Sequence, residues 1–295
     1  MNTAVSMNSR KSNATLPAKR ENRAWERFKS NRLALISLII MAALILLALL
    51  APVIAPYDPA DQDLMNRLRP PSREHWFGTD DLGRDLLSRV LYGARVSLAV
   101  GIFSVLLNVV IGVVVGSLAG YYGGRLDSLL MRFADILLAF PNFFVLITVV
   151  TLLRPSLFNI IVVFVVFGWM GKARLLRGQI MSVKNREFVD AARTIGMSDF
   201  RIIFVHILPN AIAPVIISAT LQMGSMILTE SSLSFLGLGI QPPTASWGNL
   251  LQSAQSLTIM TKAPWYPFIP GFMIFLTIMC FNFIGDGLRS ALDSR

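Results

Sequence analysis

Unbroken runs of about twenty apolar residues decide what this chain can fold into. A helix needs roughly 20 such residues to cross a bilayer core of about 30 Å, whereas a soluble chain of 295 residues could bury one core without them. A transmembrane β-barrel is excluded, because its strands would alternate in polarity. The sequence therefore predicts an all-α polytopic membrane protein whose six transmembrane helices are Leu33–Ile54, Ser97–Ala119, Phe133–Leu153, Leu157–Leu176, Leu208–Thr229 and Phe268–Gly285.

The positions of the basic residues predict the orientation of the helices. If both termini are cytoplasmic, 19 of the 27 Lys and Arg residues lie on the cytoplasmic side and 8 lie outside. Such a bias is typical of cytoplasmic loops. It also accounts for the net charge of +10, so we do not infer a nucleic-acid partner.

The same pattern predicts how the chain is divided. The first apolar run is longer than the core of a signal peptide and no convincing small-residue cleavage site follows it, so we expect an uncleaved first helix. The predicted regions are a basic cytoplasmic tail (1–32), the first helix with an outer loop (33–96), a core of five helices (97–289) and a cytoplasmic C-terminal tail (290–295).

The sequence contains no recognisable metal-binding or enzyme motif. Cys280 is the only cysteine and is expected to pack in an apolar run, and His75 and His206 have no acidic or cysteine partner motif beside them, so no metal site is predicted. The string Gly171-Lys172-Ala173 lacks the Ser or Thr of a P-loop. Zinc-protease and nucleophile-elbow motifs are also missing, so we expect no catalytic role for this chain.

The cytoplasmic loop before the fifth helix has a helical pattern. Phe188, Ala191, Ala192 and Ile195 fall on one helical face. Gly196 then suits a helix end, and Pro209 can begin the next transmembrane helix. Such an amphipathic helix could dock into a partner's groove or lie on the lipid headgroups, and periodicity alone favours neither.

The spacing of this loop resembles the EAA loop of binding-protein-dependent ABC importer permeases. The family pattern is Glu-Ala-Ala, three residues, Gly, nine residues, Ile, any residue, Leu-Pro. The chain matches it at Ala191, Ala192, Gly196, Leu208 and Pro209. Asp190 replaces the Glu and keeps its charge, whereas His206 replaces the Ile at a packing position.

Three further stretches resemble the dipeptide, oligopeptide and nickel group of these permeases, in its C-type subunit. They are His75–Asp85, Glu230–Gly239 with Trp247-Gly248 after it, and Asn282–Arg289. The resemblance implies a type I importer permease fold in which the loop is a coupling helix that docks into an ATPase subunit. The docking residues it implies are Glu187, Phe188, Asp190, Ala191, Ala192, Ile195, Gly196 and Phe200.

The resemblance also implies the partners and the cargo. They are a second homologous permease subunit in a heterodimer, two ABC ATPase subunits that hold ATP and Mg²⁺, an extracytoplasmic substrate-binding protein, and the lipid of a bacterial or archaeal inner membrane. No cofactor is expected on this chain. Di- or oligopeptides are the expected cargo, with nickel or another small solute as alternatives. A self-sufficient channel or secondary transporter is less favoured, because we expect no ionisable residues at helix centres.

Several other residues have both a structural and a functional interpretation. Gly112, Gly116 and Gly120 allow close helix packing, either within the chain or against a neighbouring subunit. Asp135 is expected to pair with nearby Arg132 rather than to act in transport. Glu230 could meet a substrate or simply bond to the serine-rich turn after it, and Trp247 could lie at the membrane interface or in an outer docking surface.

Overall fold

The computed structural model describes residues 25–153 and 156–292. Most of the predicted N-terminal tail, and the last residues of the C-terminal tail, lie outside the described residues. Within the described part every named element is a helix, in agreement with the predicted all-α class.

Three long helices follow the predicted apolar runs. They are α2 (Arg32–Ile54), α3 (Leu86–Tyr122) and α14 (Trp265–Leu292). Helix α3 begins well before the predicted Ser97, because the carboxylate of Asp85 accepts a hydrogen bond from the Ser88 amide at 2.8 Å and caps the helix.

The third predicted span is not one helix. It is divided into α4 (Gly124–Leu138) and α5 (Asn142–Leu152), which meet at 79°. Pro141 lies at the break; it has no amide to donate and disfavours helical geometry at the residue before it. The prediction of an unbroken helix over Phe133–Leu153 is therefore wrong.

The fourth span is longer than predicted. Helices α6 (Leu157–Val166) and α7 (Met170–Val183) together form one candidate span, well beyond the predicted end at Leu176. The short break between them contains Gly168, where a side chain would collide with Asn108 on α3. Because the span extends to Val183, Lys172 lies near its middle, so the expectation that no ionisable residue lies at a helix centre is wrong for this span.

The fifth span begins earlier than predicted and is bent. The helical run comprises α9 (Asp199–Arg201), the π-helical turn η2 (Ile202–Ile207) and α10 (Leu208–Ala211), followed after Ile212 by α11 (Ala213–Phe235). The two parts meet at 63°. Pro209 lies in the first turn of α10, as predicted, but α10 continues a helical run that already begins at Asp199. The missing amide of Pro209 favours the wider π-type bonding before it.

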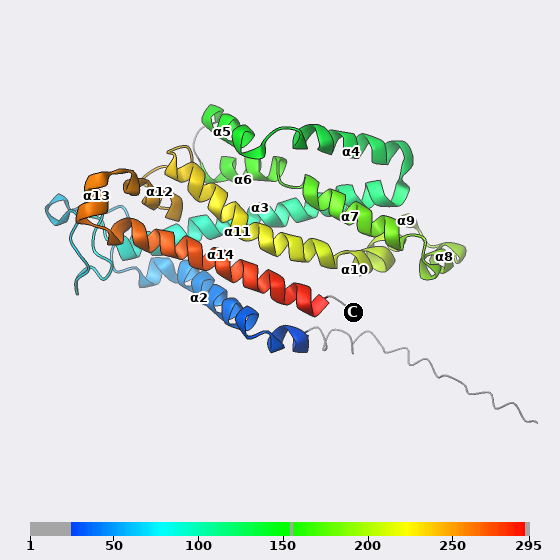
Figure 1. The fold of residues 1–295 in the computed structure, drawn as a ribbon, viewed down its shortest axis with the longest axis horizontal. Coiled ribbons are helices and arrows are strands. Elements are labelled where there is room, and N and C mark those ends of the chain that lie inside the picture. The colour runs from blue at the N-terminus through cyan, green and yellow to red at the C-terminus, as the bar shows by residue number, and fades with distance from the viewer. Residues whose placement is uncertain (1–24, 154–155, 293–295) are drawn as a thin grey trace, which may run out of the picture.

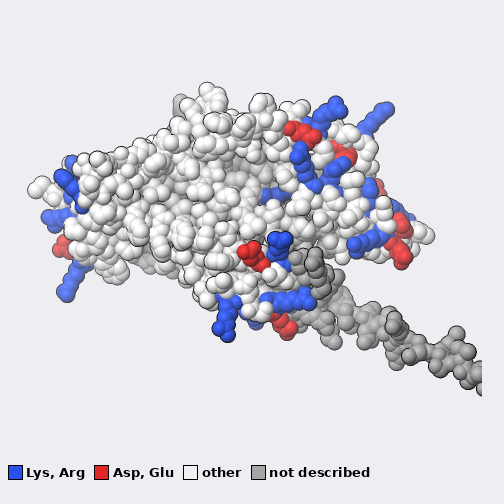
Figure 2. All heavy atoms as spheres, viewed as in Figure 1, with Lys and Arg blue, Asp and Glu red and all other residues white. Residues whose placement is uncertain are grey.

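The number of spans depends on how the bent pairs are counted. In the described part of the chain, four helices are long and apolar enough to cross a membrane, and each bent pair adds one, for up to six. Figure 2 shows Lys, Arg, Asp and Glu gathered toward the ends of the molecule, with a broad uncharged surface between them. This distribution is the one expected of a multi-pass membrane protein.

Helix α3 lies at the centre of the bundle, in contact with α2, α6, α7 and α11, while α14 packs between α2 and α11 (Figure 1). The short helix α8 (Glu187–Thr194) lies at one end of the bundle. At the opposite end lie the loop with the 3-10 turn η1 (Leu64–Asn66), α12 (Trp247–Leu251), η3 (Gln252–Gln255) and α13 (Leu257–Lys262). We call these the α8 end and the α12 end.

Candidate functional site

The segment from Glu187 to Phe200, which we call the elbow, forms the tip of the α8 end. Helix α8 carries Glu187 and Asp190 in its first turn and Arg193 in its last. Acidic residues near the start of a helix and a basic residue near its end interact favourably with the helix dipole. The predicted short helix is thus present, with local electrostatics that support it.

Gly196 ends α8 in the predicted turn. Its φ is 74°, a left-handed conformation that glycine adopts without a penalty. The Gly196 amide donates to the Arg193 carbonyl at 2.9 Å, and the Met197 amide donates to the Ala192 carbonyl at 3.2 Å. This pair of bonds is a Schellman motif, which fixes the direction in which the chain leaves α8.

One side of α8 anchors the elbow to the bundle. Val189 and Ala192 are buried in an apolar cluster with residues from α7, η2 and α10, including Leu176, Ile180 and Ile203. Since two turns of α8 are packed against this cluster, the elbow should move together with α7 and η2.

The other side of the elbow leaves apolar groups exposed. Phe188, Ile195 and Phe200 have 38%, 71% and 71% of their surface exposed, and Ala191 is exposed beside them. The ring of Phe200 packs at 4.5 Å on that of Phe204. The predicted apolar face therefore needs a correction: Ala192 belongs to the buried side, because α8 turns it toward the cluster.

Polar contacts join the elbow to the end of α3. The Tyr121 hydroxyl donates to the Asp199 carboxylate at 2.7 Å, and the Arg193 guanidinium lies 5.6 Å from the centre of the Tyr121 ring. Just before the elbow, at the end of α7, the Lys184 ammonium donates to the Gly120 carbonyl at 3.0 Å. Sequence reasoning missed these contacts, because they join segments that are far apart in the chain.

Helices α3 and α7 pack closely along a glycine seam. A Cβ atom at Gly112 would lie 2.7 Å from the Lys172 Cβ, one at Gly116 would lie 2.6 Å from the Ala173 carbonyl oxygen, and one at Gly120 would lie 2.9 Å from the Ile180 Cβ. The seam therefore serves packing within the chain, which is the structural interpretation of the three glycines. It also ties the elbow's α7 anchor to the centre of the bundle.

The comparison with known families decides what this arrangement is. Residues 112–295 match the family described as binding-protein-dependent transport system inner membrane component, and residues 22–71 match the N-terminal TM domain of oligopeptide transport permease C. The chain belongs to this permease family.

Curated relatives agree over nearly the whole length. The permease is 44% identical to the oligopeptide transport system permease protein OppC of Bacillus subtilis over 92% of this chain and 88% of that protein. It is 45% identical to the dipeptide transport system permease protein DppC of Alkalihalophilus pseudofirmus over 92% and 89%. It is 43% identical to the glutathione transport system permease protein GsiD of Escherichia coli O157:H7 over 92% and 89%.

In this permease Glu230 is buried among serine side chains. Its carboxylate accepts hydrogen bonds from Ser234 at 2.7 Å, Ser97 at 3.2 Å and Ser231 at 3.4 Å. The bonds to the serines after it agree with the structural interpretation, although α11 continues past Glu230, so the residue is not at a helix end. Because the side chain is completely buried, it does not reach an outer contact.

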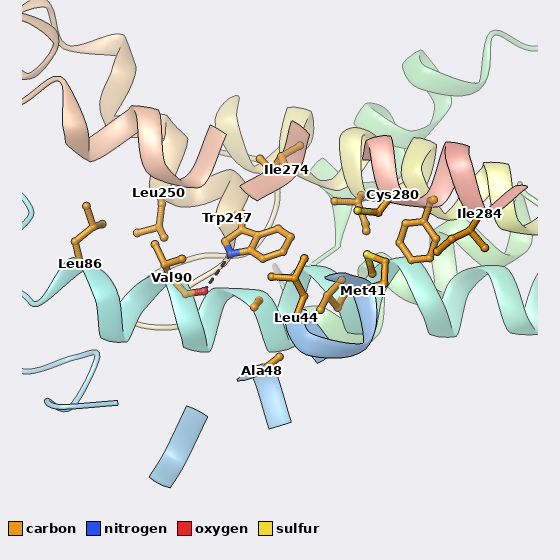
Figure 3. Packing of buried hydrophobic residues seen from close by; sticks show 14 of the residues in the cluster. Met41, Leu44, Ala48, Leu86, Val90, Trp247, Leu250, Ile274, Cys280 and Ile284 are labelled. Carbon is orange, nitrogen blue, oxygen red and sulfur yellow. Dashed lines mark hydrogen bonds between the residues drawn. The ribbon is translucent and has the colours of Figure 1, made fainter. Parts of the chain in front are cut away.

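Trp247 is buried as well. Its indole nitrogen donates to the Val90 carbonyl at 3.0 Å, and the ring lies among apolar residues of α2, α3, α12 and α14 (Figure 3). The burial of Trp247 shows that both predicted positions, at the membrane interface and in an outer docking surface, are wrong. No local sequence signal distinguishes this buried tryptophan from Trp76, whose side chain is exposed.

Ion pairs hold the outlying α4 against α7 in the permease. Asp135 pairs with Arg174 and not, as predicted, with Arg132, and Asp127 binds Arg177 through bonds of 2.5 and 2.6 Å. At the α12 end, His75 lies 2.9 Å from the Asp85 carboxylate, a partner that sequence reasoning did not assign.

Proposed function

We propose that this chain forms half of the transmembrane pore of an ATP-driven importer, and that short peptides are its cargo. Its relatives include permeases named for oligopeptides and dipeptides and one named for glutathione, which is itself a tripeptide. The observation that carries the proposal is the elbow, a rigid segment with an exposed apolar face at a charged end of the molecule.

The proposed assembly contains this chain and a second, homologous permease subunit. Two ATPase subunits supply ATP and Mg²⁺, and an extracytoplasmic protein delivers the cargo; no catalysis is assigned to this chain. The exposed apolar side chains of α4 and α5, such as Leu129, Phe133 and Phe144, are available to lipid or to that second subunit. The elbow and both termini would be cytoplasmic, in the inner membrane of a bacterium or archaeon.

The docking residues are the exposed members of the predicted set. Phe188, Ala191, Ile195 and Phe200 offer apolar contact, and the exposed Glu187 and Asp190 lie around them. A small apolar centre with a polar rim is the usual composition of a protein interface. Ala192 and Gly196 act indirectly, by holding α8 in place and by setting its exit turn.

The proposed mechanism transmits motion through the elbow. When the ATPase subunits close on ATP, the docked α8 moves with them. The Schellman turn at Gly196 and the helical run from Asp199 to Ala211 pass this motion to α11. Rigid-body movement of packed elements is a common form of switching, and here it would alternate access to the pore.

Co-purification tests the assembly. The complex is extracted in several mild detergents through a tag on this chain, and an ATPase subunit should be recovered with it. If none is recovered in any detergent, while proteoliposomes with this chain alone carry solute, the chain is a self-sufficient channel and the proposal fails.

Gly196→Val tests the coupling. A β-branched side chain disfavours the left-handed turn, so ATP hydrolysis should continue while peptide uptake is lost. Gly171→Ala is a matched control, since nothing lies within 4 Å of a Cβ there. Normal uptake in Gly196→Val, at equal amounts of inserted protein, would contradict the coupling role.

A further inference from the structure

An apolar groove lies between α2 and α3 on the surface of the bundle. Its volume is about 500 Å³, and its apolar lining includes Ile45, Leu49, Ile102, Phe103 and Leu157. Leu49 and Phe103 have 67% and 53% of their surface exposed, so the groove is open on one side. Its lining positions on α3 extend from Tyr92 to Phe103, a rise of about 16 Å along the helix axis. This length is comparable with the depth of one leaflet, since a bilayer core is about 30 Å thick.

The end of the groove nearest the α12 end carries a basic side chain. Arg95 is exposed there, and its guanidinium lies 5.8 Å from the centre of the Tyr92 ring. Within the described part of the chain, neither the Arg95 guanidinium nor the Tyr92 hydroxyl has an ion pair or a hydrogen bond, and no carboxylate lines the groove. Both groups are therefore accessible donors with no acceptor from the protein.

Arg95 also lies at the boundary of the uncharged part of α3. The run that follows it, Val96–Tyr122, contains no Asp, Glu, Lys or Arg and is longer than the roughly 20 residues that cross a bilayer core. Helix α3 begins at the α12 end (Figure 1), and Arg95 lies about 14 Å along it from Leu86. Tyrosine side chains such as Tyr92 gather at the same boundary. Lipid phosphates lie at this depth, within reach of the guanidinium.

We propose that the groove binds an anionic phospholipid from the leaflet on the α12 side. One acyl chain lies between α2 and α3, and the phosphate accepts hydrogen bonds from the Arg95 guanidinium and the Tyr92 hydroxyl. Charge complementarity selects this occupant, because a guanidinium binds phosphate strongly and basic pockets between membrane helices hold anionic headgroups. A zwitterionic lipid carries its own cation and gains less from Arg95. The site depends neither on the cargo nor on the assembly proposed above.

Native mass spectrometry of the full-length protein tests the site. The protein, with any subunits that stay bound, is extracted in a mild detergent and freed of lipid. It is then mixed with equal amounts of phosphatidylglycerol and phosphatidylcholine that carry the same acyl chains. Since the chains fill the groove equally, a preference comes from the headgroup. The parent should bind one molecule of phosphatidylglycerol at least fivefold more tightly than phosphatidylcholine.

Two variants separate the headgroup from the chain. Arg95→Gln removes the charge and should abolish the preference, so that phosphatidylglycerol binds no more tightly than phosphatidylcholine. Ala99→Phe fills the groove without a change of charge and should weaken binding of both lipids at least fivefold. Arg73→Gln, at an exposed position in the outer loop, is the matched control for the loss of one positive charge and should behave like the parent. Because Arg95 is exposed, Arg95→Gln leaves the packing intact and decides the test even if Ala99→Phe does not fold.

Three results would overturn the proposal. Equal binding of the two lipids by the parent, or an unchanged preference in Arg95→Gln, would mean ordinary solvation by lipid. Displacement of phosphatidylglycerol by a large excess of inorganic phosphate would mean a site for free phosphate, whereas a lipid held by its chain should stay bound. Binding to the separated chain that disappears when other subunits are attached would mean that a subunit covers the groove.

Discussion

The two ends of this molecule differ in which side chains they bury and which they expose. At the α12 end, Asp80, Arg84 and Trp247 are all buried and hydrogen-bonded within the chain. At the α8 end, Ile195 and Phe200 are apolar and yet mostly exposed. Both ends lie outside the uncharged belt of the surface (Figure 2), so contact with lipid chains does not explain the difference.

The difference shows which end is complete without a partner. Burying an ion pair costs free energy unless its hydrogen bonds are satisfied. Asp80, Arg84 and Trp247 find hydrogen-bond partners within the chain, so these buried residues need none from another subunit. Exposed apolar side chains on an anchored helix do not add to the folding stability of the isolated chain. We therefore expect substitutions at the α12 end to affect folding, and substitutions on the exposed side of the elbow to affect assembly.

Trp247→Ala should have the largest effect on stability. Truncation of a buried aromatic residue costs about 3–5 kcal/mol, and the hydrogen bond to the Val90 carbonyl is lost as well. Heating the detergent-solubilised protein with a thiol-reactive dye reports unfolding, because the single cysteine, Cys280, is buried in the native state. Trp76→Ala is the control, since that side chain is 70% exposed and should change little. If Trp247→Ala and Trp76→Ala lowered the unfolding temperature equally, burial at the α12 end would not explain its stability, and the contrast between the two ends would fail.

The α8 end could be predicted from the sequence because its signals are local. The apolar spacing from Phe188 to Ile195 and the glycine after it are enough to define a short helix with a fixed exit. What the pattern could not decide is how α8 is rotated. Val189 and not Phe188 faces the bundle, since the anchoring cluster is formed by α7 and η2, which lie elsewhere in the chain.

The α12 end could not be predicted in the same way because its contacts are long-range. The partner of Trp247 is Val90, and that of Glu230 includes Ser97, so both depend on how α3 packs against the last third of the chain. The apolar runs likewise predicted that the spans exist, but they did not predict where the spans bend. The break at Pro141 is a local signal that the continuous apolarity of its surroundings concealed.

Gly116→Ala should have the next largest effect, because it tests whether the glycine seam fixes the elbow to the rest of the bundle. The added Cβ would lie 2.6 Å from the Ala173 carbonyl oxygen, so α3 and α7 would have to separate. Overpacking of this kind costs about 1–3 kcal/mol, which the same dye assay would detect as a lower unfolding temperature. Gly178→Ala, where a Cβ meets nothing within 4 Å, should be neutral or slightly stabilising, since alanine favours the helix. A Gly116→Ala protein as stable as Gly178→Ala would show that the seam is loose.

Gly196→Ala should have a smaller and more local effect. Left-handed geometry costs a residue other than glycine about 1–2 kcal/mol, while the space around Gly196 is open, so only the backbone is strained. Hydrogen exchange measured by mass spectrometry should show faster exchange in α8 and unchanged exchange in α3 and α14. Faster exchange throughout the bundle would mean that the elbow is part of the folding core, and the contrast between the two ends would be weaker.

Ile195→Ser should have the smallest effect on stability and yet separate the two ends most clearly. The side chain is 71% exposed, and surface substitutions usually change stability by less than about 0.5 kcal/mol. If the exposed side of α8 is an interface, recovery of the ATPase subunit with the purified chain should nevertheless fall several-fold. Thr194→Ser, on the same short helix, is the control for handling and expression. A stable Ile195→Ser protein that keeps its full complement of ATPase would show that Ile195 is not among the few residues that carry most of the binding energy of an interface.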